Sequence, residues 1–488
     1  MNRTVRHVAV AMIAMFVALL INSNVVQVGE ASSLNSNPAN HRPLYDSYSR
    51  QRGPIVAGGT DVARSVATKG ALKYLRVYPQ GKVYAPATGY FSLVYGSTGV
   101  EQGENGVLAG TSNKLFFNRL SDEITGHQPR GGSVVLTLDP RAQQAAYNAL
   151  AQHTVDYNGV RSGAVVALDP RTGAILALAS YPSYDPSVLS THNSKQIRRS
   201  WHQLVTDPSN PMLDRALNET YPPGSTFKVI TAATALSSGK YNPQSQLPAP
   251  NQLSFPETTH TLSNFEGETC PGGGSISLSD ALKVSCNTAF GALGLRLGGD
   301  RLAAQTQKFG FGQSLSVPLP VSPSRYDKPP SQALLADSAI GQYDDAVTPL
   351  QMAMVAAAVA NHGLIMKPYL VKQTRKPDAS VLSTTHPTPF SQAISPAVAS
   401  ELTTMMERVV NESGGTGGAA RIAGITVAGK TGTAENQPGA PTHAWFIAFA
   451  PAEHPKIAVA VVVPHGGQGG VAAAPIARTV MCSVLGCS

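Results

Sequence analysis

The first apolar segment of the chain is an unbroken run from Val8 to Ile21, preceded by Arg3 and Arg6. A positive flank ahead of an apolar core is typical of an export signal. The run is short for a membrane span, which needs ~20 residues, and Gly29-Glu30-Ala31 resembles a small-residue cleavage site. Residues 1–30 therefore predict export, and they leave open a cleaved signal peptide or an uncleaved membrane anchor.

The next two segments differ from this run in their polar patterning. Residues 31–59 are rich in Ser, Asn, Arg and Pro and predict a linker. Across 60–155, short apolar segments such as Lys82-Val83-Tyr84 alternate with glycine-containing turns, which predicts a small, mostly extended accessory domain. Asp139-Pro140 then opens a predicted helix that runs to about Gln152.

Residues 156–488 show both strand and helix periodicity. The segments 163–168 and 174–179 flank a turn that contains Pro and Gly, and they predict a β-hairpin. Three more strands are predicted near the C-terminus: 425–433, 444–450 and 457–464. The last two are nearly continuous apolar runs, so the sheet should be covered on both faces. Apolar helical patterns occupy four segments: 225–236, 279–297, 349–360 and 475–484. Strands at both ends with helices between them predict an α+β fold.

Composition adds few constraints to this picture. The chain has 488 residues and a net charge of +8, which favours anionic surfaces such as lipid headgroups or wall polymers. The cations are scattered, so nucleic-acid binding is not predicted. Four cysteines permit two disulfides in an oxidising compartment. Proximity favours Cys270–Cys286 and Cys482–Cys487, and the alternative of small buried thiols stays open. The cysteines and histidines form no pattern that suggests a zinc site.

Three short motifs occur in a fixed order along the chain: Ser225-Thr-Phe-Lys228, Ser285-Cys-Asn287 and Lys430-Thr-Gly432. Each has a weaker match elsewhere: Ser237-Ser-Gly-Lys240, Ser33-Leu-Asn35 and Arg171-Thr-Gly173. The context of these second matches argues against them, because they lie at a helix end, in the linker and in a hairpin turn.

The first motif has the chemistry of an activated nucleophile. Ser225 begins a predicted helix, and residues i and i+3 share a helical face, so Lys228 can reach the serine hydroxyl. A serine needs a base to remove its proton. A lysine can be that base if burial and a neighbouring cation such as Lys430 lower its pKa. The free N–H groups of the helix N-terminus suit an oxyanion.

The other two motifs can position a peptide. The Ser285 hydroxyl can relay a proton to a leaving amine, and the Asn287 amide can both donate to and accept from a peptide backbone. Lys430 can neutralise a substrate carboxylate. Gly432 permits close approach of a backbone, and the Thr433 N–H can be the second oxyanion donor.

In this order the motifs resemble those of the penicilloyl serine transferase superfamily. Longer strings strengthen the resemblance: Tyr221–Lys228, Lys430–Glu435, His443–Pro451, Thr348–Ala353 and Leu168–Gly173. Together they are similar to class B penicillin-binding proteins, most of all to the compact actinobacterial penicillin-binding protein A group, over about residues 50–485. Two positions depart from the pattern. Tyr343 stands where the family usually has Gly, and Cys286 is less usual inside its motif.

The resemblance implies a penicilloyl serine transferase fold and a D,D-transpeptidase that cross-links peptidoglycan stem peptides. Ser225 would attack the penultimate D-Ala, and Lys430 with Thr431 would hold the terminal carboxylate. It also implies acylation by β-lactams, a single-pass protein in the cytoplasmic membrane with its catalytic domain outside, and partners in the division or elongation machinery, including a glycan polymerase.

Two alternatives remain beside this prediction. A D,D-carboxypeptidase or β-lactamase-like hydrolase would use the same serine, and a non-catalytic penicillin-binding sensor or divisome scaffold would not react. The complete set of motif residues argues against an inactive protein. A Ser-His-Asp hydrolase is disfavoured because no Gly-x-Ser-x-Gly elbow occurs.

Overall fold

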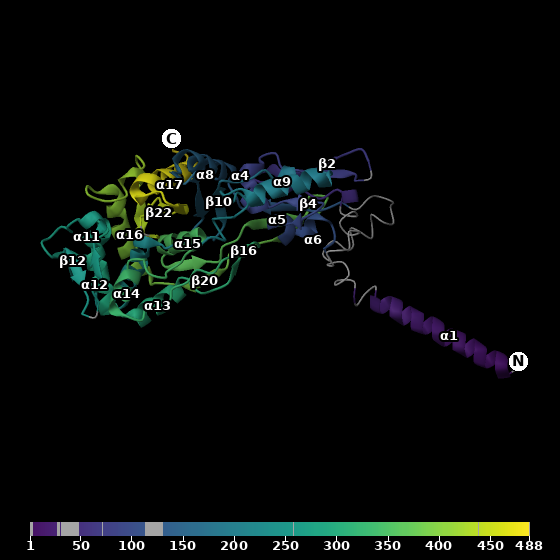
Figure 1. Ribbon diagram of the computed structural model, residues 1–488, viewed down its shortest axis with the longest axis horizontal. Helices are drawn as coiled ribbons and strands as arrows, with labels where there is room; N and C mark the ends of the chain where they lie inside the picture. The colour runs from purple at the N-terminus through teal and green to yellow at the C-terminus, as the bar shows by residue number, and fades with distance from the viewer. Residues whose placement is uncertain are drawn as a thin grey trace.

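The computed structural model describes residues 3–26, 30, 48–70, 72–112, 130–256, 258–437 and 439–487. An elongated folded body lies at one side, and the separate helix α1 (Arg3–Asn24) lies at the other (Figure 1). No residue of α1 is buried. Within the described residues it is the one helix long and apolar enough to cross a membrane.

The catalytic body is built on a five-stranded sheet in the order β10-β9-β23-β22-β21. Its strands are β9 (Gly163–Leu168), β10 (Ile175–Tyr181), β21 (Ala428–Ala434), β22 (His443–Ala450) and β23 (Ile457–Val463). All neighbouring pairs are antiparallel. The predicted hairpin and the three C-terminal strands are thus confirmed. β21 lies at an edge of the sheet, with one side unpaired.

Apolar helices cover both faces of this sheet, as the continuous apolar strands predicted. α15 (Pro349–Ala360) is entirely buried and shares one core with Trp445, Ile447 and Phe449 of β22. On the other face, α8 (Pro140–His153) and α17 (Gly469–Leu485) share a second core with Phe446. Alternate side chains of the strand therefore enter opposite cores.

Helix α8 begins where the sequence predicted. Asp139 caps it by accepting hydrogen bonds from the backbone N–H groups of Arg141 and Ala142. The helix packs mainly on the catalytic sheet and on α17, although its residues fall within the 60–155 segment. The boundary at residue 155 stays a prediction.

A helical lobe lies at the end of the body farthest from α1 (Figure 1). It contains η4 (Gly224–Phe227), α10 (Lys228–Ser237), α11 (Leu278–Lys283), α12 (Asn287–Leu297), α13 (Gly299–Lys308), α14 (Gln332–Ser338) and α16 (Pro396–Asn411). The single helix predicted for 279–297 is wrong. The chain breaks between α11 and α12, where Ser285 has a φ of 62°.

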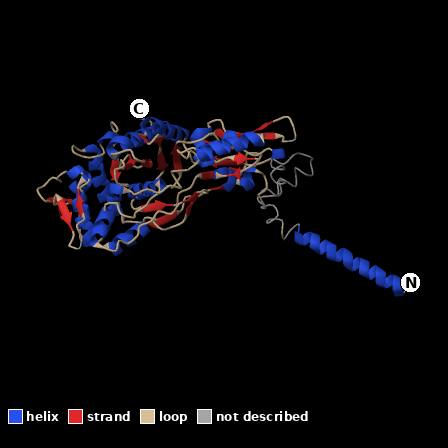
Figure 2. Cartoon of the chain, viewed as in Figure 1, coloured by secondary structure: helices blue, strands red, loops and turns tan. Residues whose placement is uncertain are grey.

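The accessory region is a six-stranded sheet in the order β19-β18-β6-β1-β2-β3, with helices beside it (Figure 2). The strands are β1 (Ile55–Ala57), β2 (Thr60–Ala67), β3 (Tyr74–Val77), β6 (Ser133–Leu136), β18 (Val371–Arg375) and β19 (Val381–Thr384). Its helices are α4 (Gly81–Thr88), α5 (Gly99–Gly103), α6 (Asn105–Leu108), η3 (Pro186–Leu189) and α9 (Ser194–Thr206). The extended structure predicted for Lys82-Val83-Tyr84 is wrong, because these residues lie in α4.

Short elements complete the described chain. Six two-stranded ladders pair β4 (Phe91–Ser92) with β5 (Gly96–Ser97), β7 (Asp156–Tyr157) with β8 (Val160–Arg161), β11 (Gln246–Pro248) with β14 (Ser275–Ser277), β12 (Gln252–Ser254) with β13 (Thr261–Ser263), β15 (Leu315–Ser316) with β16 (Pro320–Val321), and β17 (Leu364–Met366) with β20 (Pro389–Gln392). The remaining 3₁₀ turns are η5 (Phe265–Gly267) and η6 (Gly418–Ala420).

A cluster of buried charged side chains connects separate segments of the accessory region. The Glu101 carboxylate is fully buried and accepts from the Arg52 Nε at 2.5 Å and the Arg76 Nε at 2.6 Å. The Tyr78 hydroxyl donates to the same carboxylate at 3.2 Å. The Arg52 guanidinium also lies 4.4 Å from the centroid of the Phe91 ring. Every charge of this cluster therefore has an opposite charge beside it.

Candidate active site

The candidate nucleophile, Ser225, lies in a tight turn that leads into α10 and packs against the edge strand β21. Gly224 has a φ of 52°, and its N–H donates to the Gly341 carbonyl at 2.9 Å. A Cβ atom at Gly224 would lie 2.8 Å from the Thr433 carbonyl oxygen, so the turn requires glycine. Ser225 follows directly and is 8% exposed. Among the described residues, its hydroxyl forms no side-chain hydrogen bond.

Lys228 is fully buried at the start of α10. Its Nζ donates to the Ser285 carbonyl at 2.6 Å and to Asn287 Oδ1 at 2.7 Å, and it lies 3.2 Å from Ser285 Oγ. The Phe290 ring lies on its other side, with the centroid 5.6 Å from Nζ. Burial lowers the pKa of Lys228 well below its usual value, and the charge of Lys430 lowers it further.

Ser285 lies between the two lysine amines. Its Oγ is 3.2 Å from Lys228 Nζ and 2.9 Å from Lys430 Nζ. The residue has a left-handed φ of 62°, which is costly for a non-glycine residue and recurs at functional sites. This conformation turns the chain between α11 and α12, so that one serine supplies both its carbonyl and its hydroxyl to the site.

Lys430 lies on β21 and is also fully buried. Besides Ser285 Oγ, its Nζ donates to the Thr431 carbonyl at 2.9 Å. Burial lowers the pKa of Lys430 to about 7. The Thr431 hydroxyl lies 3.4 Å from Lys430 Nζ and is hydrogen-bonded to the Thr416 hydroxyl at 2.6 Å. Such a set suits a carboxylate ligand.

Gly432 and Thr433 bring the edge strand against the nucleophile turn. A Cβ atom at Gly432 would lie 2.8 Å from Trp445 Cβ and 2.9 Å from Thr226 Cγ2, so the close packing again requires glycine. The Trp445 indole N–H donates to the Pro222 carbonyl at 2.9 Å and fastens the turn to the sheet. The unpaired side of β21 can accept an extended peptide as an added strand.

Three residues shape this site in ways that the sequence did not reveal: Thr416, Asn264, and Trp445, whose indole bonds the nucleophile turn to the sheet. The Asn264 Oδ1 accepts from the backbone N–H groups of Asn287 at 2.8 Å and Thr288 at 3.2 Å, so it caps α12. The Ser263 carbonyl accepts from the Asn287 amide at 3.1 Å. These bonds direct the Asn287 Oδ1 toward Lys228. Asn264 belongs to no motif, so only the tertiary structure reveals its role.

The four cysteines are paired in the structure, Cys270 with Cys286 and Cys482 with Cys487. The first disulfide connects the middle residue of the Ser285–Asn287 motif to the loop that follows Asn264. It therefore joins the two segments that hold Asn287. The second lies at the end of α17, away from the site.

Tyr343 shows how the chain accommodates its departure from the family pattern. Its φ is 68°, the left-handed conformation that a glycine adopts without strain. Its side chain is 42% exposed. The neighbouring Gly341, whose carbonyl binds Gly224, has a φ of 80°. The backbone thus has the shape that a glycine favours while carrying a tyrosine.

The described residues contain no group of three or more His, Cys, Asp or Glu side chains that could hold a metal ion.

Comparison with known proteins agrees with this arrangement. The penicillin-binding protein transpeptidase domain family matches residues 163–482, and the penicillin-binding protein A dimerisation domain family matches 52–134. The chain is 48% identical to the peptidoglycan D,D-transpeptidase PbpA of Mycolicibacterium smegmatis and 45% identical to that of Mycobacterium tuberculosis, over 99% of each chain. A solved structure of penicillin-binding protein A from M. tuberculosis, a penicillin G acyl-enzyme complex, superposes with a TM-score of 0.85 at 45% identity, covering 89% of this chain and 100% of the other. The chain belongs to the class B penicillin-binding proteins.

Proposed function

We propose that this chain is a peptidoglycan D,D-transpeptidase in which Ser225 is the nucleophile and Lys228 is its base. One observation carries the assignment of roles. Two fully buried lysines, which pair with no carboxylate in the part of the chain that the structure describes, converge on the Ser285 hydroxyl next to the serine turn. Burial and mutual repulsion favour the neutral amine at Lys228, and a neutral amine can accept a proton.

In the acylation step, the neutral Lys228 amine accepts the proton of Ser225 while Oγ forms a bond to the carbonyl carbon of the penultimate D-Ala. The backbone N–H groups of Ser225 and Thr433 stabilise the oxyanion. The tetrahedral intermediate then breaks its C–N bond. The departing D-Ala amine takes the proton from Lys228 through the Ser285 hydroxyl, which leaves an ester on Ser225.

The remaining residues orient the peptide. Lys430 and Thr431 hold the terminal carboxylate, and Gly432 lets the peptide backbone approach the edge strand. Asn287 bonds to a peptide amide beside the nucleophile. In the second step, the amine of a neighbouring stem peptide attacks the ester and loses a proton through the same groups. The new amide is the cross-link, and Ser225 regains its proton.

A β-lactam would acylate the same serine, because its strained amide and its carboxylate occupy the positions of the D-Ala-D-Ala amide and carboxylate. The acyl-enzyme complex of the M. tuberculosis relative supports this expectation. The proposal needs no metal or organic cofactor.

Mass spectrometry after incubation with penicillin tests the nucleophile. A stable adduct should appear on the peptide that contains Ser225, and Ser225→Ala should abolish it. Ser237→Ala is the matched control, because Ser237 also precedes a lysine by three residues and should keep full labelling. An adduct on the Ser225→Ala protein, or one that maps to Ser237, would contradict the assignment.

A second assay separates transfer from hydrolysis. A peptide ending in D-Ala-D-Ala is supplied with and without an acceptor stem peptide that carries a free amine. A transpeptidase should form the cross-linked product and release one D-Ala for each cross-link. Release of D-Ala without any cross-linked product would favour the carboxypeptidase alternative.

We further propose that α1 is an uncleaved anchor within residues 1–30, followed by a linker at 31–59. The accessory domain at 60–155 and the transpeptidase domain at 156–488 would then lie outside the cytoplasm, where they meet a glycan polymerase and the division or elongation machinery. A fusion of residues 1–60 to a reporter active only outside the cytoplasm should be active and should sediment with membranes. A soluble, shortened product would identify a cleaved signal peptide instead.

A further inference from the structure

Helix α9 (Ser194–Thr206) carries a row of exposed cations with no function in the site. Lys195, Arg198 and Arg199 are all exposed and recur at the spacing of one helical face. The helix contains no Asp or Glu. Among the described residues, neither Lys195 nor either arginine forms an ion pair or a side-chain hydrogen bond. These cations are therefore available to an anionic partner.

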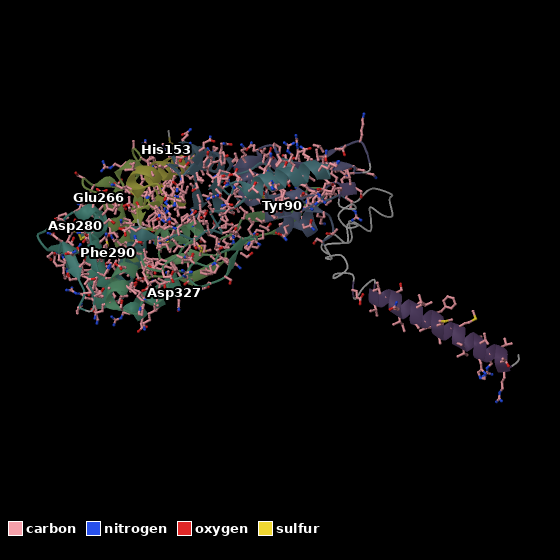
Figure 3. All side chains as sticks on the ribbon, viewed as in Figure 1. Tyr90, His153, Glu266, Asp280, Phe290 and Asp327 are labelled. Atoms are coloured by element: carbon pink, nitrogen blue, oxygen red, sulfur yellow. A yellow bond between two sulfur atoms is a disulfide. The ribbon has the colours of Figure 1, made fainter. Side chains whose placement is uncertain are left out.

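The opposite face of α9 fixes the helix on the accessory region. Ile197 is fully buried. The Trp201 ring stacks on Tyr95 with centroids 4.1 Å apart and meets the edge of Tyr90 at 6.1 Å. Figure 3 shows Tyr90 in the accessory half of the body and Phe290, which lies beside Lys228, in the opposite half. The cations thus lie on a packed helix in the half of the body opposite the catalytic lysines.

The row of cations lies beside the point where the chain from α1 enters the folded body. Tyr48 is 1% exposed, stacks on Phe91 and meets the His192 ring at 5.6 Å. His192 directly precedes Asn193, the cap of α9. The His192 ring also bonds to the Tyr74 carbonyl at 3.0 Å, next to the exposed Lys73. Lys73, Lys195, Arg198 and Arg199 form what we call the basic patch.

We propose that the basic patch binds anionic phosphate headgroups of the membrane that holds α1. The proposal rests on the membrane attachment proposed above and goes beyond the transpeptidase activity. Its basis is charge complementarity together with the position of the tether. The chain from Asn24 to Tyr48 spans at most about 85 Å even when fully extended. Because the tether keeps the basic patch within that distance of the bilayer, the effective concentration of headgroups at the patch is on the order of millimolar. Weak individual contacts are therefore enough for binding.

The contact would orient the body relative to the membrane. The accessory region would rest on the bilayer surface, and the helical lobe at the opposite end of the body would extend toward the wall (Figure 1). Electrostatic attraction to headgroups acts over about 8 Å at physiological salt, so the patch must lie at the surface for the contact to form.

Lysine footprinting on the full chain tests this proposal. The protein is reconstituted through α1 into nanodiscs of phosphatidylcholine alone, or of phosphatidylcholine with phosphatidylglycerol. Acetylation rates by an N-hydroxysuccinimide ester are then measured by mass spectrometry. Lys195 should react at least fivefold more slowly in the anionic nanodiscs, and 0.5 M NaCl should remove the difference. The exposed Lys308 of α13 is the internal control and should react equally in both.

A matched pair of variants completes the test. Arg198→Glu/Arg199→Glu should abolish the protection of Lys195. Lys240→Glu/Arg301→Glu changes the net charge by the same amount at exposed positions in the helical lobe, keeps Lys308 as the internal control, and should preserve the protection. Equal Lys195 rates in both nanodiscs would overturn the proposal. Protection by a soluble polyphosphate in neutral nanodiscs, as strong as that by the anionic bilayer, would also overturn it and assign the patch to a phosphorylated polymer. Penicillin acylation in the same nanodiscs tests the transpeptidase assignment separately.

Discussion

Two clusters of buried charged side chains in the described part of the chain are built on opposite principles. In the accessory region, Arg52 and Arg76 share the Glu101 carboxylate, and all three are buried. At the catalytic site, Lys228 and Lys430 are buried with hydroxyls, carbonyls and one amide as their partners, and among the described residues no carboxylate is paired with them. Both clusters are desolvated, but only in the first does each charged side chain have an opposite charge beside it.

The difference appears in the protonation of each cluster. Burial alone would raise the pKa of Glu101, but Arg76 and Arg52 outweigh burial, and the pKa lies below its usual value. At Lys228 burial and the neighbouring Lys430 both lower the pKa. A paired charge thus stays charged and supports the structure, whereas an unpaired buried lysine loses its proton and can act as a base.

The largest effect is expected at the unpaired lysine. Lys228→Arg keeps a cation but removes the neutral base, because a guanidinium does not deprotonate at ordinary pH. The rate of penicillin acylation should fall by about 10³-fold or more. Stopped-flow or quenched labelling over a range of penicillin concentrations separates this loss from weaker binding.

Lys430→Arg is the matched control, since it preserves the charge that we assign to carboxylate binding. It should keep measurable acylation, with weaker binding from the altered geometry. If Lys228→Arg acylated nearly as fast as the wild type while Lys430→Arg did not react, the two roles would be reversed.

A substitution in the Arg52–Arg76–Glu101 cluster should lower the free energy of unfolding and leave the acylation rate unchanged. Glu101→Gln leaves two buried arginines without a counter-charge, and breaking a buried pair in this way costs about 3–5 kcal/mol. Denaturant unfolding should show this loss, while the folded protein keeps its acylation rate. Glu412→Gln is the control. It removes an exposed carboxylate that pairs with Arg408, so it should cost less than about 1 kcal/mol. A Glu101→Gln protein as stable as this control would show that the two clusters do not differ as we argue.

Much of the catalytic body could be predicted from the sequence, because its signals are local. The apolar runs at 444–450 and 457–464 fix two strands and the burial of both faces. Asp139 before Pro140 fixes a helix start. The three motifs name Ser225, Lys228, Ser285 and Lys430, and the fold brings these side chains to one site.

The features that were missed depend on tertiary contacts. No Gly or Pro in the sequence indicates the break at Ser285. The left-handed backbone of Ser285 is maintained instead by its contacts with the two lysines and by the contacts of Asn287. β18 and β19 join the accessory sheet from more than 200 residues beyond β6, which no local pattern indicates. Lys82–Tyr84 forms a helix although its short apolar pattern resembles a strand.

Asn264 provides a smaller test, because it acts on the lysine site only through Asn287. Asn264→Ala removes the acceptor for two N–H groups of α12 and should lower the acylation rate by about tenfold while costing about 1 kcal/mol of stability. Asn264→Asp keeps the acceptor and should restore most of the rate. Asn193→Ala removes an equivalent cap from α9, with two N–H partners, and should leave acylation unchanged. Equal acylation rates in Asn264→Ala and Asn193→Ala would show that Asn264 acts only as a helix cap and does not position Asn287 for catalysis.

The smallest expected effect is the pH dependence that the lysine pair imposes. Acylation needs Lys228 neutral, so it requires a pH above the lowered pKa of Lys228, and it needs Lys430 charged, so it requires a pH below about 7. The charge of Lys430 lowers the pKa of Lys228, so Lys228 loses its proton first, and the two requirements overlap. The apparent second-order rate constant for penicillin reports the free enzyme. It should fall about fivefold from pH 7 to pH 8 as Lys430 loses its charge. In Lys430→Arg the guanidinium stays charged, and this alkaline decline should disappear. A wild-type rate that stayed level or rose through pH 8 would show that the Lys430 charge is not required for penicillin binding.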